Sequence, residues 1–295
     1  MSTTIWRDEP VLTTSGGGLT MAVSAARGGK IVSLRDAAGI EWLAQPLPGP
    51  LPRPAEPGDE FTEAEMCGWD ECAPTIDAGS VDGRPVPDHG DLWTVRFDAN
   101  GSTVSAIGPS LGYRFTRTAV GTERGIRLDY EAEALEAPTP FLWTAHPQFD
   151  APYGTRLQFD TPPTSLVDVT APTSVDVPYD DNLLTLDSLP PHGCRKVYLP
   201  PAHRSHGLTL VRPDGTLRMS WSETVPYLGV WFDNSSVSTQ RVIAPEPALG
   251  FYDSLEFAVS QDRTPRLTPG TPLRWWVELS QDPRTGAVAS GTRRV

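Results

Sequence analysis

The sequence predicts an all-β protein of antiparallel strands, and three observations indicate this. The 31 Pro and 26 Gly residues are spread along the whole chain of 295 residues, so long helices have little room. Between these breaks apolar residues recur at every second position, which places them on one face of a strand. No window of ten or more residues has a convincing helical pattern. We therefore expect a sandwich or barrel of short strands.

The clearest strands are those in which apolar and polar residues alternate. Such runs cover 126–130, 217–221 and 273–279, and Leu255, Phe257 and Val259 form a further set. A hairpin turn at Pro213-Asp214-Gly215 is expected to join the second run to 208–210. Weaker strands are expected at 21–25, 31–34, 93–97, 113–118, 157–159 and 227–232.

No fixed repeat and no shift in composition divides the chain. The Pro-rich stretch 46–57 has strand-like sequence on both sides, so we interpret it as a loop over the end of a sheet. Residues 1–295 are accordingly expected to form a single β-sandwich domain.

Charge and composition exclude several classes of protein. Asp and Glu number 37 against 24 Lys and Arg, a net charge of −13, which opposes binding to nucleic acid or to an anionic membrane surface. No stretch approaches the roughly 18 apolar residues of a membrane helix. The N-terminus lacks a secretory pattern and three Cys cannot complete a disulfide framework, so we expect a cytoplasmic protein.

Chemically reactive side chains gather in three parts of the chain. The first comprises 65–76 and the nearby 87–93, the second 141–149, and the third 244–255. Each combines His, Asp or Glu with apolar and turn residues in a way that an ordinary strand does not require.

Together with the flanking segments, these stretches resemble the aldose 1-epimerase, or galactose mutarotase-like, superfamily. The matching motifs, in family order along the chain, are Gly28-Gly29-Lys30-Ile31, His89-Gly90 with Trp93, His146-Pro147-Gln148-Phe149, Glu246-Pro247 with Asp253-Ser254, and 267–276. The resemblance implies an antiparallel β-supersandwich with its site in a cleft on one sheet face.

The resemblance also implies roles for three residues. Glu246 would be the general base on the anomeric hydroxyl, His146 the general acid on the ring oxygen, and His89 a substrate-positioning residue. Opening a hemiacetal ring requires one proton to be removed and one to be added, so a carboxylate and an imidazole suffice without metal or cofactor. The simpler interpretations are a hydrogen-bonded core histidine and, between two prolines, a turn-capping glutamate.

Sugar-binding side chains are suggested by residue type. Trp69, Trp143 or Trp231 could stack on a sugar ring, and Asp70 or Glu71 could bind its hydroxyls, unless these carboxylates simply belong to a solvated acidic loop. Many characterised sugar mutarotases carry an early arginine in an Asn-Arg context that does not stand in that form here, and Arg53 is a candidate substitute.

Metal binding is the weaker interpretation of the cysteines and remaining histidines. Cys67 and Cys72 have four residues between them, and no second Cys pair follows. The set His192, Cys194, His203 and His206 contains zinc-type ligands at a spacing that fits no known pattern. A loop at the cleft rim is the alternative, in which His192 or His206 could touch substrate.

The sequence thus predicts a cofactor-independent, aldose 1-epimerase-like enzyme whose ligand is a small carbohydrate. The acidic residues Glu56, Asp59, Glu60, Glu63 and Glu65 favour a neutral sugar over a sugar phosphate. The alternatives are a non-catalytic carbohydrate-binding sandwich and an enzyme of the same fold with different sugar chemistry. The oligomeric state stays open.

Overall fold

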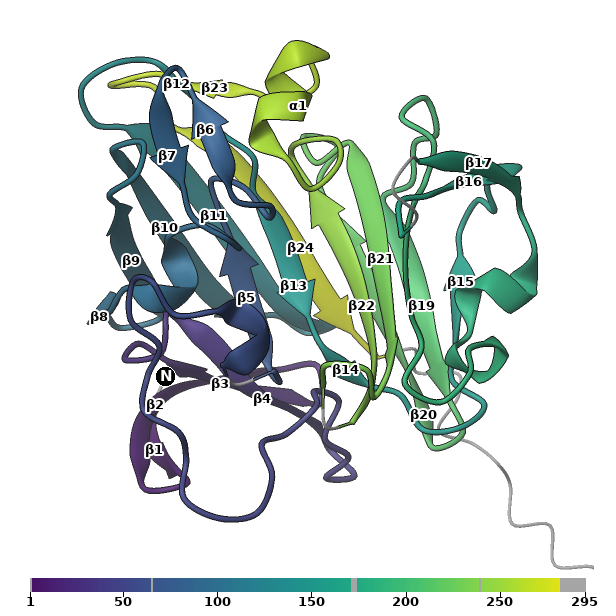
Figure 1. The fold of residues 1–295 in the computed structure, drawn as a ribbon. Coiled ribbons are helices and arrows are strands. Elements are labelled where there is room, and N and C mark those ends of the chain that lie inside the picture. Colours follow the sequence, from purple (N-terminus) through teal and green to yellow (C-terminus); the bar gives the residue numbers. More distant parts are fainter. Residues whose placement is uncertain (1, 65, 171–173, 239, 282–295) are drawn as a thin grey trace, which may run out of the picture.

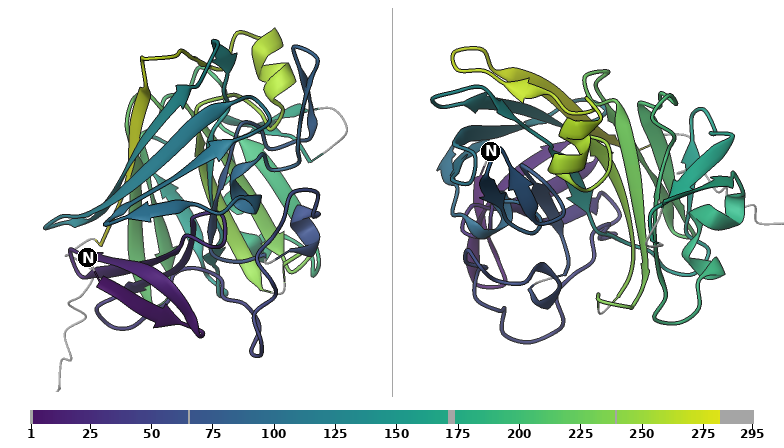
Figure 2. Two further views of the ribbon diagram at one scale, coloured as in Figure 1. Left: turned by 90° about the vertical axis from the view of Figure 1, so that its left-hand side faces the viewer. Right: turned by 45° about the horizontal axis from the view of Figure 1, so that its top comes forward.

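Two large antiparallel sheets dominate the computed structural model, which describes residues 2–64, 66–170, 174–238 and 240–281 (Figures 1 and 2). The predicted all-β, antiparallel fold is confirmed, because all pairs of named strands within these ranges run antiparallel.

The larger sheet has twelve strands. They are β1 (Ser2–Trp6), β2 (Glu9–Gly16), β3 (Leu19–Ser24), β4 (Lys30–Asp36), β5 (Trp69–Cys72), β13 (Thr144–Pro147), β14 (Phe149–Asp150), β16 (Ser165–Asp168), β17 (Val175–Pro178), β18 (Cys194–Tyr198), β21 (Tyr227–Asn234) and β22 (Arg241–Ala248). Their order is β1-β2-β3-β4-β5-β13-β22-β21-β18-β16-β17, with β14 also paired to β22.

The second sheet has eight strands in the order β15-β19-β20-β24-β11-β10-β9-β8. They are β8 (Asp98–Asn100), β9 (Thr103–Gly108), β10 (Tyr113–Gly121), β11 (Gly125–Ala134), β15 (Arg156–Phe159), β19 (Gly207–Arg212), β20 (Gly215–Trp221) and β24 (Leu273–Ser280). Two small hairpin-like sheets pair β6 (Gly79–Val81) with β7 (Arg84–Val86) and β12 (Thr139–Pro140) with β23 (Arg266–Leu267).

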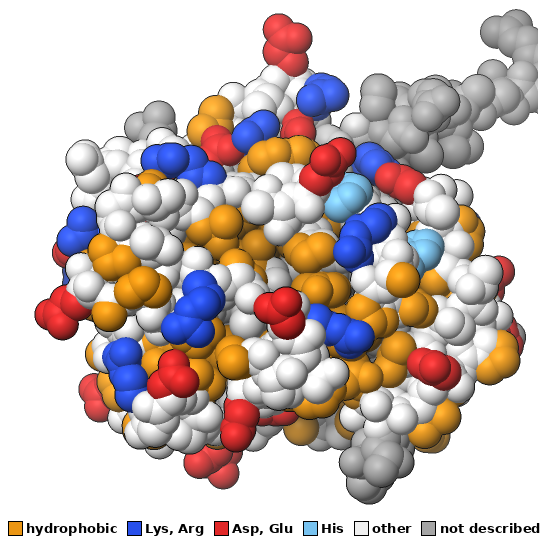
Figure 3. Space-filling view, turned by 90° about the horizontal axis from the view of Figure 1, so that it is seen from above, with side chains coloured by type: hydrophobic (Ala, Val, Ile, Leu, Met, Phe, Trp, Pro, Cys, Tyr) orange, Lys and Arg blue, Asp and Glu red, His pale blue; other side chains and the backbone are white. Residues whose placement is uncertain are grey.

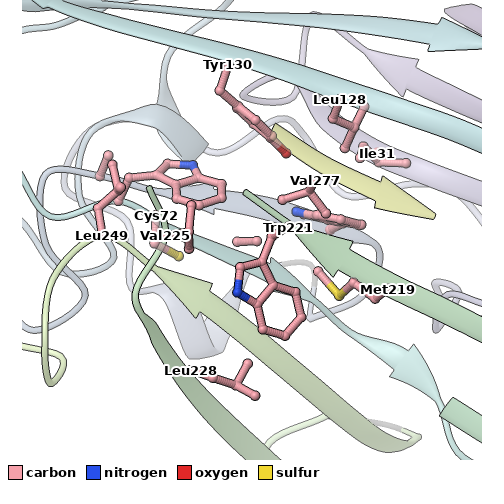
Figure 4. Close-up of a cluster of buried hydrophobic side chains, with 14 of the residues drawn as sticks. Ile31, Cys72, Leu128, Tyr130, Met219, Trp221, Val225, Leu228, Leu249 and Val277 are labelled. Atoms are coloured by element: carbon pink, nitrogen blue, oxygen red, sulfur yellow. The ribbon is translucent and has the colours of Figure 1, made fainter. Parts of the chain in front are cut away.

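The main hydrophobic core lies between the two large sheets. Leu128 and Tyr130 of β11, Trp221 of β20 and Val277 of β24 meet side chains of the larger sheet, among them Ile31 (Figure 4). Alternation along β11 explains this arrangement, since its even-numbered residues from 126 to 134 are buried and the odd-numbered ones from 127 to 133 are only partly covered. Burial of this apolar surface is the main force that joins the sheets.

The predicted hairpin is confirmed, because β19 pairs with β20 and Arg212 lies opposite Gly215 across the turn. Two other predicted strands are wrong. Residues Leu255–Ser260 form the short helix α1, whose N-terminus is capped by Ser254: its hydroxyl accepts a hydrogen bond from the Phe257 amide at 3.2 Å. Phe257 and Val259 are 38% and 36% exposed, so their alternation with Leu255 marks no buried strand face.

Residues 93–97 also form no strand. The 3₁₀ turn η2 (Leu92–Thr94) occupies their beginning, and Trp93 is buried at the loop beside β5. The other short helical turns are η1 (Phe61–Glu63), η3 (Asp181–Leu184) and η4 (Leu186–Ser188). The loop 46–57 connects β4 to β5 and leads into η1.

The surface carries charges of both signs. On the face that holds α1, Lys and Arg side chains alternate with Asp and Glu and do not merge into one basic region (Figure 3). Among the described residues, no helix has the length and apolar character needed to cross a membrane.

Candidate active site

Three neighbouring strands of the larger sheet align Asp70, His146 and Glu246 in one row. On β5 and β13, Asp70 lies opposite His146. On β13 and β22, Thr144 lies opposite Ala248, and continuing that antiparallel register places His146 opposite Glu246. Residues opposite each other in a sheet point to the same face, so these three side chains share one face. Figure 1 shows β5, β13 and β22 side by side.

The next two strands extend the row. Glu246 lies opposite Gly229 of β21, which in turn lies opposite Tyr198 of β18. Lys196 lies two residues before Tyr198 on β18, and its cross-strand partner Trp231 lies two residues after Gly229 on β21. Because side chains alternate along a strand, Lys196 and Trp231 point to the same face as the row. This face of β5, β13, β22, β21 and β18 is called the site face below.

Glu71 and Trp143 are not on the site face. Glu71 accepts hydrogen bonds from Arg117 at 2.6 Å, from the Tyr130 hydroxyl at 3.1 Å and from the Trp143 indole at 2.8 Å. Arg117 and Tyr130 belong to the second sheet, so these groups form a polar cluster inside the core. The structure therefore does not support the predicted sugar-binding roles of Glu71 and Trp143, because both are fully buried between the sheets.

His146 and Glu246 form a buried acid–base pair. The imidazole Nε2 lies 3.6 Å from carboxylate Oε1, and the residues are 4% and 1% exposed. Burial, together with the nearby His89 and Lys196, lowers the pKa of His146 well below its usual value. Burial raises the pKa of Glu246 to about 7. Within the described part of the chain, His146 Nδ1 and Glu246 Oε1 are buried atoms without a hydrogen-bond partner.

Lys196 lies against the other carboxylate oxygen. Its Nζ contacts Glu246 Oε2 and lies 3.1 Å from Asp253 Oδ1, which also accepts a 2.5 Å hydrogen bond from the Tyr198 hydroxyl. Asp253 belongs to one of the motifs in the sequence, whereas Lys196 belongs to none of them. Only the order of strands brings β18 beside β21 and so reveals it.

His89 reaches the pair from a loop. Its Nδ1 is 2.9 Å from the Asp88 carboxylate, its ring stacks on Phe61 at 3.7 Å between centroids, and it meets His146 edge-on at 5.9 Å. Trp231 lies on another side of His146, with ring centroids 5.8 Å apart. The predicted residues His89, His146, Trp231 and Glu246 are thus close together in space.

The 3₁₀ turn η1, which follows the Pro-rich loop, covers this group with Phe61, which is only 3% exposed and stands edge-on to His146 at 5.5 Å. Beside Phe61 is a cleft of about 290 Å³ that Asp70, Arg53 and Lys30 help to line. Lys30 Nζ is 3.1 Å from the Asp70 carboxylate. Arg53 is on the far rim, where it makes a 2.8 Å ion pair with Asp59. No signal in the sequence identified Phe61.

Trp69 is fully buried in the main core, and the cysteine and histidine sets do not assemble. Cys67, Cys72 and Cys194 form no disulfide bond, and the first two are buried whereas Cys194 is exposed. His192 and His203 each contact a backbone carbonyl, of Ser235 and Thr161. Among the residues that the structure describes, no three His, Cys, Asp or Glu side chains are placed to hold a metal ion.

Neither a protein-family model nor a curated protein matches the chain. Solved structures do. A protein from Synechocystis sp. PCC 6803 superposes with a TM-score of 0.72 at 16% identity, covering 96% of this chain and 100% of that one. A galactose mutarotase-like protein from Lactobacillus casei ATCC 334 gives 0.68 at 16% identity, covering 92% and 100%.

The chain has the galactose mutarotase-like fold. A galactose mutarotase related enzyme from Lactobacillus acidophilus is a further example, with a TM-score of 0.67 at 14% identity over 95% of this chain and 99% of that one. The fold expected from the ordered motifs is therefore confirmed. At these identities the likeness concerns the galactose mutarotase-like fold itself, and activity has to be argued from the side chains.

Proposed function

We propose that this protein is a cofactor-independent isomerase of the aldose 1-epimerase type, which interconverts the anomers of a neutral aldose. The observation that supports this is the buried contact, 3.6 Å long, between the His146 imidazole and the Glu246 carboxylate. The galactose mutarotase-like fold of the whole chain is consistent with it.

The contact suits the chemistry of ring opening. The anomeric hydroxyl and the ring oxygen are bonded to the same sugar carbon, so the groups that serve them must be neighbours. The step starts with the shared proton on His146 and with Glu246 ionised, a state in which the lowered pKa of His146 makes its imidazolium a stronger acid. Glu246 removes the proton of the anomeric hydroxyl while His146 gives its proton to the ring oxygen, and the open aldehyde forms. Rotation about the bond between C1 and C2 and closure with the roles reversed yield the other anomer. The acid–base pair holds one proton throughout.

A neutral sugar agrees with the charges around the pair. Lys30 faces Asp70, and Lys196 faces both Glu246 and Asp253, so each cation is already balanced by carboxylate. A phosphate group would have to compete with these contacts. Trp231 can stack on a sugar ring, whereas His89 and Asp70 can bind hydroxyl groups.

A second candidate function is sugar binding without turnover. Phe61 stacks on His89 and stands against His146, so its ring takes space above the acid–base pair. If that loop stays in place when sugar binds, the pair would not reach the ring oxygen.

Anomer exchange measured by NMR on freshly dissolved aldoses tests the proposal. We expect His146→Ala and Glu246→Gln each to lower the catalysed rate by about a hundredfold to ten-thousandfold, because each removes a proton-transfer group. His203→Ala and Glu131→Gln are matched controls, since neither residue lies on the site face. Equal rates for wild type and both site variants would contradict the assignment. Binding of sugar without faster exchange would support the second candidate.

A further inference from the structure

We propose that Lys196 is a positioning residue of the acid–base pair, whose ammonium group, clamped between Asp253 and Glu246, orients the Glu246 carboxylate toward His146 and stabilises its ionised form. This proposal rests on the function proposed above for its catalytic meaning. The effect of Lys196 on the Glu246 carboxylate depends only on the contacts of Lys196, so it can be tested apart from the enzyme activity.

The strand register gives Lys196 access to Glu246. The position between β18 and β22 in the row is Gly229, which has no side chain. A Cβ atom there would lie 3.0 Å from ring atoms of Tyr198. The Tyr198 ring therefore takes the space over Gly229, and the long lysine side chain crosses β21 beside that ring, with Nζ 5.7 Å from its centroid, to reach the carboxylate.

Asp253 fixes the other side of the ammonium group. Its carboxylate takes the hydrogen bond from Tyr198 at 2.5 Å, and its backbone carbonyl accepts hydrogen bonds from the Ile76 and Asp77 amides, both at 2.9 Å. The Lys196 side chain is 14% exposed, so it is held within the protein and is not free to sample solvent. Two anchored carboxylates therefore determine where its charge lies.

That charge opposes the effect of burial on Glu246. The titratable groups that face or influence this carboxylate are Lys196 and Tyr198 of β18, His146 of β13, Cys72 of β5, and His89 and Asp253 of the loops. Burial favours the neutral acid, Lys196 favours the carboxylate, and Asp253 disfavours it. Lys196 stays protonated, because its two carboxylate partners outweigh burial and raise its pKa.

The sign of the pH effect follows from the shared proton. As the pH rises through the pKa of Glu246, about 7, the acid–base pair loses its only proton and exchange should fall. Removing the positive charge of Lys196 raises that pKa. The falling limb of the pH profile should then move to higher pH, while poorer orientation of Glu246 lowers the maximum rate.

The test compares wild type with Lys196→Met and Lys196→Arg. In Lys196→Met we expect the falling limb of the kcat/KM pH profile to move to higher pH by about one unit or more. This is the size of effect expected when a carboxylate loses a cation in direct contact with it. Lys196→Arg should restore the limb toward its wild-type position. Arg218→Met, which removes a cation paired with Asp160 on the second sheet, is the control and should not move it.

A second readout does not need turnover. The carboxyl ¹³C resonance of Glu246, assigned from its loss in Glu246→Gln, should titrate at higher pH in Lys196→Met. Asp253→Asn should shift it the opposite way, because a charge that disfavours the carboxylate is removed. An unchanged midpoint in either variant overturns the proposal for Lys196. If wild type accelerates no sugar while the midpoints move as stated, the proposed enzyme function fails and the electrostatic role of Lys196 stands.

Discussion

Two adjacent carboxylates on β5 show how one position along a strand decides a residue's role. Asp70 lies in the row with His146, whereas Glu71 points into the core and binds Arg117. Sequence alternation separates the two faces of a strand but does not say which one is the core when both residues are acidic. The sequence alone therefore does not distinguish Asp70 from Glu71, and only the position of the second sheet does.

The core ion pair yields a stability prediction. Arg117→Met leaves Glu71 buried without its cationic partner, so we expect a loss of about 3–5 kcal/mol in the free energy of unfolding at pH 7. Arg274→Met breaks the ion pair with Glu131, in which the arginine is 68% exposed, and should cost about 1 kcal/mol or less. Urea unfolding, with midpoints compared at a common m-value, measures both. Similar losses for the two variants would contradict a special role for the buried pair.

Among the elements, predictability depended on exposure. Strands such as β11 and β24 have one partly exposed face, and their alternating sequence revealed them. All four residues of β5 are buried, as are all four of β13, so these strands have no polar face to produce alternation. A family motif marks the segment that carries His146, but none marks the segment that carries Asp70, and neither has the alternation of a strand. The alternating residues 255–259 belong to the helix α1 and not to a strand.

The loop that carries His89 depends on a close approach between backbones. Gly90 has φ +73°, and a Cβ atom there would lie 2.0 Å from the carbonyl oxygen of Ala73, next to β5. Gly83 has φ +75° with nothing within 4 Å of such an atom. Gly83→Ala should therefore cost only about 1–2 kcal/mol of left-handed strain, whereas Gly90→Ala adds a backbone collision and displaces His89.

Calorimetric melting of the two glycine variants measures this difference. We expect Gly90→Ala to melt at a clearly lower temperature than Gly83→Ala, with weaker sugar binding in titrations of the folded protein. Equal melting temperatures would show that the loop moves without cost and that Gly90 does not fix the place of His89.

For the whole molecule, the site depends on strand order more than on chain order. His146 and Glu246 are far apart in the sequence and meet because β13 and β22 are neighbours. His89 joins them from a loop that the bridge between Gly90 and Ala73 ties to the end of β5. The motifs gave the identities of these residues, but nothing in the sequence placed β18 beside β21 or η1 over the histidines. Lys196 and Phe61 were missed for that reason, since long-range pairing is not encoded in local periodicity.

The shared core predicts that both sheets unfold together, as a single domain should. Leu128 of β11 is fully buried between the sheets, so Leu128→Ala should lower the free energy of unfolding by about 2–5 kcal/mol. Leu135→Ala, at a position 41% exposed, is the control and should cost much less. Hydrogen exchange followed by mass spectrometry can compare peptides from β10 and β22. In one cooperative unit, the substitution in the second sheet speeds exchange in both peptides by the same factor, because both open only by global unfolding. Faster exchange in β10 alone would mean that the sheet bearing His146 and Glu246 keeps its own stability, and the chain would then be two folding units joined by a common interface.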